Sequence, residues 1–325
     1  MSKSILIHEN GGPEKMKLED VQVGAPGPGQ VKIRHTAIGL NFIDVYTRSG
    51  LYQTPLPNAV GREGAGVIVE VGPKVKGFRK GDRVAYCGEL GAYCQERLIG
   101  VSQLVHIPKG VKDEEAAAIM LKGMTTEYLV DRCIHPWVKK GDIILFHAAA
   151  GGVGMLFGQW AKARGYKVIG TVSSPEKAAL ARKHGYKWVI DYSKENVVEE
   201  VMKITKGKKV PAVVDGVGKD TWMTSLDCLQ PRGIMASFGN ASGPVAPQSL
   251  AILNAKGSLY VTRPSLGAYT ATRADLEASA KSVFKMVKSG KVKIAIDQRY
   301  PLAEAAQAHI DLESRKTTGQ TILVP

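Results

Sequence analysis

The stretch of sequence that decides the fold is "LFHAAAGGVGM", residues 145–155. It joins an apolar run, Ile143–His147, to a helical run, Val153–Ala163. A strand, a glycine-rich turn and a helix in this order direct backbone N–H groups at the phosphates of a nucleotide. The stretch therefore predicts a dinucleotide-binding turn.

The glycines of this turn depart from the usual fingerprint, G-x-G-x-x-G. In the matching register the chain has Ala149, Gly151 and Gly154, so alanine replaces the first glycine. Gly151, Gly152 and Gly154 carry no Cβ that would block a pyrophosphate, and Ala149 fits a tight turn if its φ is negative. We expect phosphate binding here. A glycine-rich turn needed only for packing a helix on a strand is the alternative.

The alternation of strands and helices continues beyond this turn. Further strands are expected at Lys167–Val172, Trp188–Asp191, Ala212–Asp215 and Gly233–Ser237, and Pro175–His184 reads as a helix with proline in its first turn. Such βαβ alternation predicts an α/β fold with a doubly wound parallel sheet.

The first 120 residues have a different texture, rich in glycine and proline. Short β-type runs recur at Val31–Ala37, Gly66–Val71, Arg83–Tyr86 and Tyr93–Ile99, each bounded by turn residues. We expect an irregular, mostly β domain that gives way to helix around Asp113–Asp131.

The last 60 residues return to mixed structure. We expect a helix over Thr272–Ser289, a β run, a helix over Ala303–Leu312 and a final strand over Thr321–Val324. Periodicity alone leaves open which domain this tail joins.

The end of the second strand, in "GTVSSPEK", indicates which dinucleotide binds. An NAD site usually has Asp or Glu there to hold the ribose 2′-hydroxyl. Here Ser173 and Ser174 follow the strand, and Lys177 lies one turn into the helix. A charge-assisted bond to a 2′-phosphate contributes about 1.5–3 kcal/mol, so the sequence predicts NADPH. Lys177 as an ordinary exposed helix lysine is the alternative.

Composition and charge limit the class of protein. The chain has 325 residues, a net charge of +14 and 44% hydrophobic residues, which indicates a globular protein of two domains with an anionic partner. Its basic clusters, "KGKK" at 206–209 and "KSGKVK" at 288–293, are short and lack aromatic residues. They do not favour nucleic acid as the main partner.

The cysteines and the apolar runs bear on location. Cys87, Cys94, Cys133 and Cys228 show no C-x-x-C spacing, and the N-terminal apolar run has only four residues. A cytoplasmic protein without disulfides or a membrane span is the simplest expectation.

The segment "GREGAGVIVEVGPKVKGFRKGDRV", residues 61–84, resembles the medium-chain dehydrogenase/reductase superfamily. Zinc alcohol dehydrogenases have a histidine ligand where this chain has Arg62, and a cysteine ligand near Leu40–Asn41, where Asn41 is the nearest match. Zinc requires thiolate, imidazole or carboxylate ligands. The resemblance, with these departures, implies a protein without catalytic metal.

Within that superfamily the chain is most similar to the quinone oxidoreductase branch, the NADPH:quinone reductases related to zeta-crystallin. The branch pattern A-x-x-G-x-x-G is met by Ala148, Gly151 and Gly154, so the missing glycine is a trait of the branch. The matching stretches are residues 38–52, 121–129, 147–154, 237–243, 253–266 and 313–325.

The resemblance implies a GroES-like catalytic domain at 1–125, completed by the C-terminal segment 266–325, and a Rossmann domain at 126–265. It implies a homodimer that transfers hydride from NADPH to a quinone. A hydroquinone anion is stabilised by its aromatic ring, so we expect no catalytic triad and no pair of acidic residues.

The resemblance also implies roles for individual residues. Asn41, Tyr46 and Tyr52 would act at the substrate, although both tyrosines could instead only pack the domain seam. Arg315 would line the cofactor, or instead pair with Glu313 or Asp311. The full set implied to bind NADPH is Phe42, Ile43, Tyr128, Ala148, Gly151, Gly152, Val153, Gly154, Ser173, Ser174, Lys177, Tyr192, Gly216, Val217, Phe238, Gly239, Asn240, Thr262, Arg263 and Arg315.

Two other functions stay open at this stage. One is NADPH-dependent reduction of α,β-unsaturated carbonyls, which needs the same hydride transfer plus a proton for the α-carbon. The other is an NADPH-binding structural or RNA-interacting protein with little turnover, which the charge of +14 makes worth a test.

Overall fold

The computed structural model describes residues 1–325, and the chain divides into two compact units. The first unit comprises residues 1–122, 270–288 and 294–325, and the second comprises 123–269 and 289–293. None of the helices is both long enough and apolar enough to cross a lipid bilayer.

The second unit is built on a six-stranded parallel sheet. Its strand order is β11-β10-β9-β12-β13-β14, which is 3-2-1-4-5-6 when strands are counted from β9. This is the order of a Rossmann sheet, so the predicted doubly wound α/β fold is confirmed. The strands are β9 (Ile143–Phe146), β10 (Lys167–Val172), β11 (Trp188–Asp191), β12 (Val210–Asp215), β13 (Leu229–Ser237) and β14 (Tyr260–Thr262).

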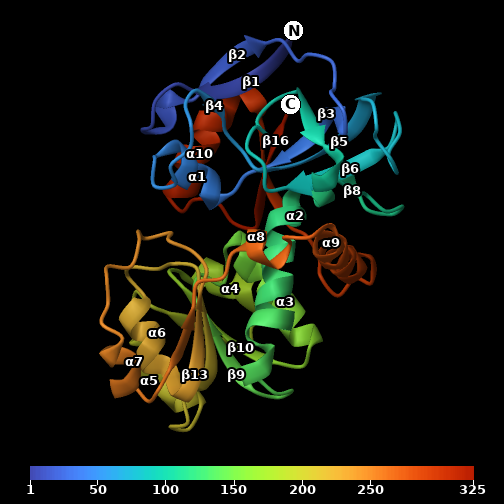
Figure 1. The fold of residues 1–325 in the computed structure, drawn as a ribbon. Coiled ribbons are helices and arrows are strands. Elements are labelled where there is room, and N and C mark those ends of the chain that lie inside the picture. The colour runs from blue at the N-terminus through green and yellow to red at the C-terminus, as the bar shows by residue number, and fades with distance from the viewer. The chain divides into compact units, whose positions relative to one another are not determined.

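Helices cover both faces of this sheet (Figure 1), with α3 and α4 on one side and α5 and α6 on the other. Leu145, Ile169 and Val213 are register partners on neighbouring strands, so they share one face of the sheet, where they are fully buried in one core cluster with residues of α5 and α6. The helices are α3 (Gly152–Ala163), α4 (Pro175–Lys183), α5 (Val197–Ile204), α6 (Trp222–Cys228), α7 (Ala251–Ala255) and α8 (Leu266–Tyr269).

The first unit contains a seven-stranded sheet and a smaller three-stranded one. The larger has the order β15-β16-β3-β5-β6-β8, with β7 also paired to β3, and the smaller has the order β2-β1-β4. The strands are β1 (Ser2–Ile7), β2 (Lys17–Val21), β3 (Gln30–Gly39), β4 (Asn58–Ala59), β5 (Glu63–Val71), β6 (Arg83–Cys87), β7 (Glu96–Gly100), β8 (Val105–His106), β15 (Ile296–Pro301) and β16 (Gln320–Val324).

The C-terminal tail forms part of this unit. β16 lies between β15 and β3, pairing Ile322 with Gly39 and Leu323 with Ile38. The helices of the unit are α1 (Phe42–Arg48), α9 (Arg273–Lys288) and α10 (Ala305–Glu313), together with the first part of α2 (Asp113–Tyr128). A π-helical turn, Leu129–Cys133, continues α2 in the second unit.

Several strands differ from expectation in their bounds: β13 begins at Leu229 instead of Gly233, and β5 begins at Glu63 instead of Gly66. Two further differences have a local cause. The strand predicted at Tyr93–Ile99 begins only at Glu96, because Tyr93 exchanges backbone bonds with Val60 and Ile5 instead of joining β7. The hairpin of β1 and β2 was not expected, since half of β2 is exposed and carries charged residues that hide its alternation.

Candidate functional site

The glycine-rich turn follows β9 directly. Its left-handed residue is Ala148, with φ of 62°, while Ala149 is outside that region and fully buried. Gly154 is required for packing, because a Cβ there would lie 2.6 Å from the carbonyl oxygens of both alanines. At Gly151 a Cβ would meet only the Ala148 oxygen, at 3.3 Å. Packing therefore explains Gly154 but does not explain Gly151.

The start of α3 is built differently from the starts of its neighbours. Gly151 is its N-cap and supplies no capping side chain, and Gly152 and Val153 form the first turn. By contrast, Ser174 caps α4 and Asn196 caps α5 through side-chain oxygens. A helix start without a capping side chain is suited to a bound phosphate.

The segment after β10 brings together the residues expected at the 2′-phosphate. Ser174 accepts a bond from the Lys177 N–H at 3.3 Å, and its hydroxyl also bonds Glu176, which holds the pKa of that carboxyl below its ordinary value. Ser173 is half-buried beside it. Tyr192, 46% exposed, follows β11, and its N–H donates to Val172 at the end of β10. No carboxylate occupies the strand end itself.

A buried carboxylate that sequence reasoning missed organises the loop after β12. Asp215 is fully buried and accepts bonds from the N–H groups of Val217 at 2.7 Å and Gly218 at 3.1 Å. Its other oxygen accepts from the hydroxyls of Thr221 and Ser225, both at 2.7 Å. The signal was available, because an aspartate ends an apolar strand directly before "GVG".

The loops after β13 and β14 are joined to the loop after β12. The Arg263 guanidinium donates to the carbonyl oxygens of Ser237 at 3.0 Å and Gly239 at 2.8 Å. Phe238 donates its N–H to the backbone carbonyl of Asp215. A Cβ on Gly239 would lie 2.4 Å from the Gly216 carbonyl oxygen, and a Cβ on Gly216 would lie 2.8 Å from the Phe238 ring. Asn240 continues this loop and Thr262 ends β14. These residues therefore gather at the carboxyl edge of the sheet, where doubly wound sheets bind ligands.

Two more residues lie at or near this edge. His147, between β9 and the glycine turn, is 2% exposed; its Nδ1 bonds Thr171 Oγ1 at 3.1 Å and its Nε2 has no hydrogen-bond partner. Burial lowers the pKa of His147. Tyr128 is 2% exposed and stacks on Tyr269, with ring centroids 4.5 Å apart, while the Arg132 guanidinium lies over the Tyr269 ring.

In the first unit, helix α1 and the turn after it carry the expected substrate residues. Asn41 caps the helix, and the Tyr46 and Tyr52 rings meet edge to face with centroids 5.3 Å apart. Phe42 packs beside Tyr46 at 6.1 Å, and Ile43 is half-buried next to it. The short helix and the residues that flank it thus group the three expected substrate residues with Phe42 and Ile43, which are expected at the cofactor.

The amide of Asn41 is held by a buried carboxylate. Asn41 is 3% exposed, and its Nδ2 donates to Glu63 Oε2 at 2.7 Å. The other Glu63 oxygen accepts from the Leu121 N–H at 2.6 Å. Burial raises the pKa of Glu63 and lowers that of Lys122. The attraction between their opposite charges opposes both shifts. Sequence reasoning missed this pair, since Lys122 lies 59 positions beyond Glu63.

Arg315 lies in the loop between α10 and β16, exposed and with φ of 60°. The carboxylate of Glu313, one of its two alternative partners, binds Arg48 through both oxygens, at 2.8 and 3.0 Å. The Tyr300 hydroxyl donates to Asp311, the other alternative, at 2.8 Å.

At the positions where the zinc alcohol dehydrogenases have metal ligands, this chain has residues of a different type. The Arg62 guanidinium donates to the Gly88 carbonyl at 2.7 Å, and Asn41 binds Glu63. Across residues 1–325, no three His, Cys, Asp or Glu side chains cluster as metal ligands would. A guanidinium cannot ligate zinc, so the donor set does not fit the metal. Activity without metal stays a prediction.

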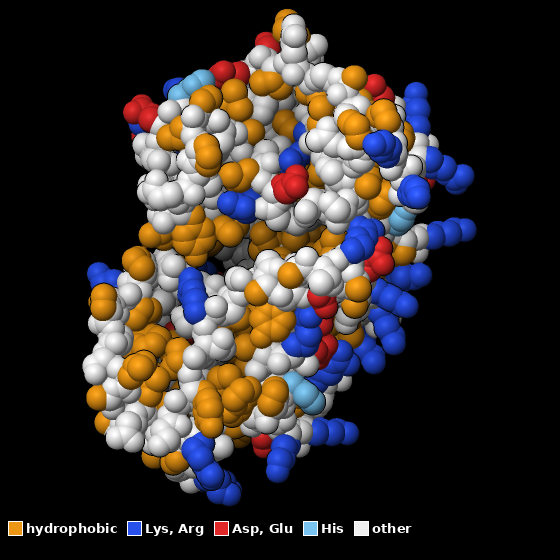
Figure 2. Space-filling model, in the orientation of Figure 1, with side chains coloured by type: hydrophobic (Ala, Val, Ile, Leu, Met, Phe, Trp, Pro, Cys, Tyr) orange, Lys and Arg blue, Asp and Glu red, His pale blue; other side chains and the backbone are white.

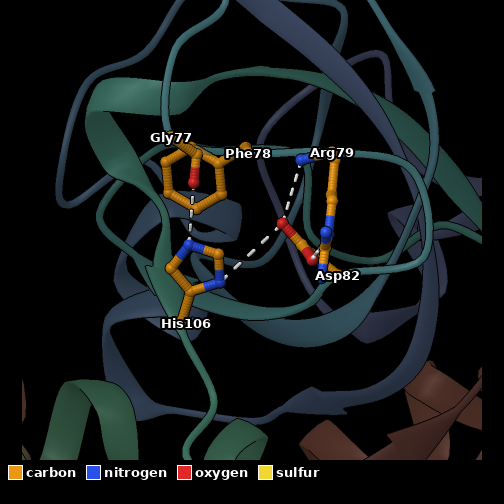
Figure 3. A pocket seen from close by; sticks show the side chains of 5 residues that line it. All are labelled: Gly77, Phe78, Arg79, Asp82 and His106. Carbon is orange, nitrogen blue, oxygen red and sulfur yellow. Dashed lines mark hydrogen bonds and ion pairs between the residues drawn. The ribbon is translucent and has the colours of Figure 1, made fainter.

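A separate shallow pocket in the first unit contains none of the expected residues (Figure 3). It is lined by Gly77, Phe78, Arg79, Asp82 and His106. The His106 ring stacks on Phe78 at 4.5 Å and donates through Nε2 to the Gly77 carbonyl at 3.0 Å.

Comparison with known proteins places this chain. Residues 27–136 match the family described as alcohol dehydrogenase GroES-like domain, and residues 152–286 match zinc-binding dehydrogenase. A quinone oxidoreductase of Pseudomonas aeruginosa is 55% identical, and the alignment covers 100% of both chains. The chain belongs to the quinone oxidoreductase family.

Other members of the quinone oxidoreductase family extend the comparison. The crystal structure of Escherichia coli quinone oxidoreductase complexed with NADPH matches with a TM-score of 0.97 and 46% identity, covering 99% of this chain and 100% of that one. A 2-haloacrylate reductase of Burkholderia is 46% identical, with 100% of this chain and 99% of that protein covered. The predicted family is thereby confirmed.

Proposed function

We propose that this protein is an NADPH-dependent quinone reductase that needs no metal. The observation that carries the proposal is the glycine turn at the carboxyl edge of the Rossmann sheet, combined with Ser173 and Lys177 where NAD-specific sites have a carboxylate. The names of its relatives, quinone oxidoreductases from several bacteria, support the same reaction.

The second unit would hold NADPH through the residues gathered at the sheet edge. The α3 start would bind the pyrophosphate, and Ser173, Lys177 and Tyr192 would bind the 2′-phosphate. Gly216 and Val217 would border the adenosine, and the remaining expected residues of this unit would line the cofactor. When bound, NADPH supplies the hydride. An NADPH complex of a relative supports this cofactor.

The first unit would supply the substrate side chains, with Phe42, Ile43 and Arg315 at the cofactor. A quinone gains one hydride and one proton to become a hydroquinone, so the chain must position its oxygens and admit a proton. The Tyr46 and Tyr52 hydroxyls are donors suited to a quinone oxygen. Asn41, whose amide nitrogen already binds Glu63, would act mainly by fixing the start of α1.

We also propose the division into a catalytic domain, residues 1–125 with 266–325, and an NADPH-binding domain, residues 126–265. A homodimer is supported by β14, an edge strand whose Tyr260 is 52% exposed. Figure 2 shows apolar side chains gathered on the face of the second unit near α6 and α7, where Met223 and Leu250 are exposed. Four free, buried cysteines favour the cytoplasm.

Two alternatives carry their own support. Reduction of an activated C=C bond, as in an enone or alkenal, is favoured by the relative named 2-haloacrylate reductase. An RNA-interacting or structural protein with little turnover is favoured only by charge, and Figure 2 shows Lys and Arg side chains spread along an edge rather than lining one groove.

The test is oxidation of NADPH, followed at 340 nm, with 1,4-benzoquinone, 9,10-phenanthrenequinone, an enone and 2-chloroacrylate in parallel. We expect quinone turnover, preference for NADPH over NADH, and full activity after exhaustive chelation. Faster turnover of the C=C substrates would replace quinone with that class. Loss of activity on chelation, restored by zinc, would overturn the metal-free proposal.

A further inference from the structure

Helix α1 presents the proposed substrate residues, yet it has only seven residues. A helix of this length has no stability of its own in water, so its position depends on tertiary contacts. Its N-terminal end is fixed by Asn41 through Glu63. The contacts of its other buried polar groups decide how the rest of the helix is held.

Two of these groups, Asp44 and Arg48, lie one turn apart on the same face of α1, and a chain of three hydrogen bonds through Tyr93 and His309 links them, forming a ring that the helix itself closes. The Tyr93 hydroxyl donates to Asp44 Oδ2 at 3.0 Å and lies 3.1 Å from His309 Nε2. His309 Nδ1 lies 3.1 Å from Arg48 Nη1. All four residues are at most 2% exposed.

The direction of every bond in the ring follows from Arg48. A guanidinium can only donate, so His309 Nδ1 accepts and its proton is on Nε2. That N–H donates to the Tyr93 oxygen, and the Tyr93 hydroxyl donates its own hydrogen bond to Asp44. Burial lowers the pKa of His309 to about 3, consistent with this neutral tautomer. The direction of each of these three bonds is therefore set while His309 is neutral and Asp44 is ionised.

The ring is also anchored outside α1. Arg48 binds Glu313 on α10 through both oxygens and donates through Nε to the Gly11 carbonyl at 3.1 Å. Asp44 accepts a second bond from the Asn41 N–H at 2.9 Å. Burial raises the pKa of Asp44 to about 7, and its donors oppose that rise.

We propose that Tyr93 and His309 are positioning residues of the reductase reaction: they fix the orientation of α1, and with it Tyr46 and the start of the helix, without touching substrate. The inference rests on the proposed function. Tyr93 precedes β7 and His309 lies on α10, so the ring uses the C-terminal segment to set the geometry of a helix more than 260 positions earlier.

The chain offers a matched control. Tyr86 is also fully buried in the first unit, and its hydroxyl donates to His35 Nε2 at 2.7 Å. Its hydrogen-bond partners, His35 on β3 and Arg97 on β7, are not part of α1. Tyr93→Phe and Tyr86→Phe therefore each remove one buried hydroxyl from a Tyr–His pair, and only the first disturbs α1.

We expect Tyr93→Phe to lower kcat for 1,4-benzoquinone about tenfold while the Kd for NADPH changes less than twofold. Tyr86→Phe should leave kcat within twofold, although both variants unfold at lower temperature. His309→Leu should resemble Tyr93→Phe. His309→Gln, which keeps an N–H donor for Tyr93, should recover most of the activity, which a purely structural role would not require.

A second readout keeps the inference separate from the proposed function. Amide hydrogen exchange in residues 42–48 should speed up in Tyr93→Phe and not in Tyr86→Phe. Equal effects of the two variants on kcat, or on exchange in α1, would overturn the positioning role. If the wild-type protein reduces no quinone, the proposed function fails, and the exchange comparison still decides whether the ring holds α1.

Discussion

The glycine turn allows packing and cofactor binding to be separated by two neighbouring substitutions. Gly154→Ala adds a methyl group 2.6 Å from the carbonyl oxygens of Ala148 and Ala149, about 0.8 Å inside ordinary contact. Gly151→Ala adds the same group where only the Ala148 oxygen lies near, at 3.3 Å, and the φ of Gly151, −76°, suits alanine. Gly154→Ala must displace backbone atoms, whereas Gly151→Ala requires only a small shift of the Ala148 carbonyl.

The expected magnitude for Gly154→Ala combines two opposing effects. Overpacking of this kind costs about 1–3 kcal/mol, and alanine in a helix regains about 1 kcal/mol over glycine. Because two backbone carbonyls must move, we expect the upper part of that cost, about 2–3 kcal/mol. The net loss is then about 1–2 kcal/mol, or a fall in Tm of roughly 2–8 °C. Gly151→Ala should leave Tm within about 1 °C, because its Cβ meets a single atom.

The cofactor assay gives the opposite ranking if Gly151 lies against a pyrophosphate. NADPH binding, followed by the fluorescence of the reduced nicotinamide, should weaken at least about tenfold in Gly151→Ala, because the added Cβ stands between the backbone N–H groups and the phosphates. A Gly151→Ala protein that is stable and binds NADPH like the wild type would refute the assignment of the turn. A Gly154→Ala protein as stable as the wild type would refute the packing argument.

Three further outcomes are expected. Ala148 holds a left-handed φ of 62°, so Ala148→Gly should leave the free energy of unfolding unchanged or raise it by up to about 1 kcal/mol. Ala149→Gly should instead lower the free energy of unfolding by about 1 kcal/mol, as measured by urea denaturation. Lys177→Ala should raise the Kd for NADPH about tenfold or more and leave that for NADH unchanged, with Lys183→Ala at the far end of α4 as the control; equal losses for both cofactors would remove Lys177 from the site. Burial lowers the pKa of His35 to about 4, below its unfolded value of about 6.5, so its contribution to stability is complete above that value and lost as the pH falls toward 4. Between pH 7 and pH 5 wild type should lose about 2 kcal/mol more than His35→Gln in urea denaturation, and parallel curves for the two would contradict the buried neutral histidine.

Local sequence patterns predicted much of the second unit. β10 and β11 have the predicted bounds, and β9, α3 and α4 differ from prediction by one residue. Apolar strands, turn residues and helix caps are local signals, so a window of ten residues contains them. The same pattern placed Gly151 and Ser173 in the turns after two strands and Lys177 in the first turn of a helix before any pairing of strands was known.

The turn itself shows the limit of such patterns. The fingerprint register put the tight turn at Ala149, whereas the left-handed residue is Ala148, the alanine of the branch pattern. Matching a sequence motif cannot distinguish two adjacent alanines, because either one fits a position that calls for a small residue. Only the backbone path from β9 into α3 distinguishes them, because it determines which residue must reverse the chain.

What the sequence determined by itself is the βαβ alternation, the position of the glycine turn proposed to bind phosphate, and the absence of a carboxylate after the second strand. What the tertiary structure decided is the strand order, the insertion of β16 beside β3, and the buried polar partners Asp44, Tyr93 and His309. The physical reason is the separation along the sequence over which each kind of interaction acts. Periodicity and turn chemistry act over a few residues, whereas strand pairing and polar burial join groups up to 265 positions apart, and a buried tyrosine or histidine looks the same in sequence as an exposed one.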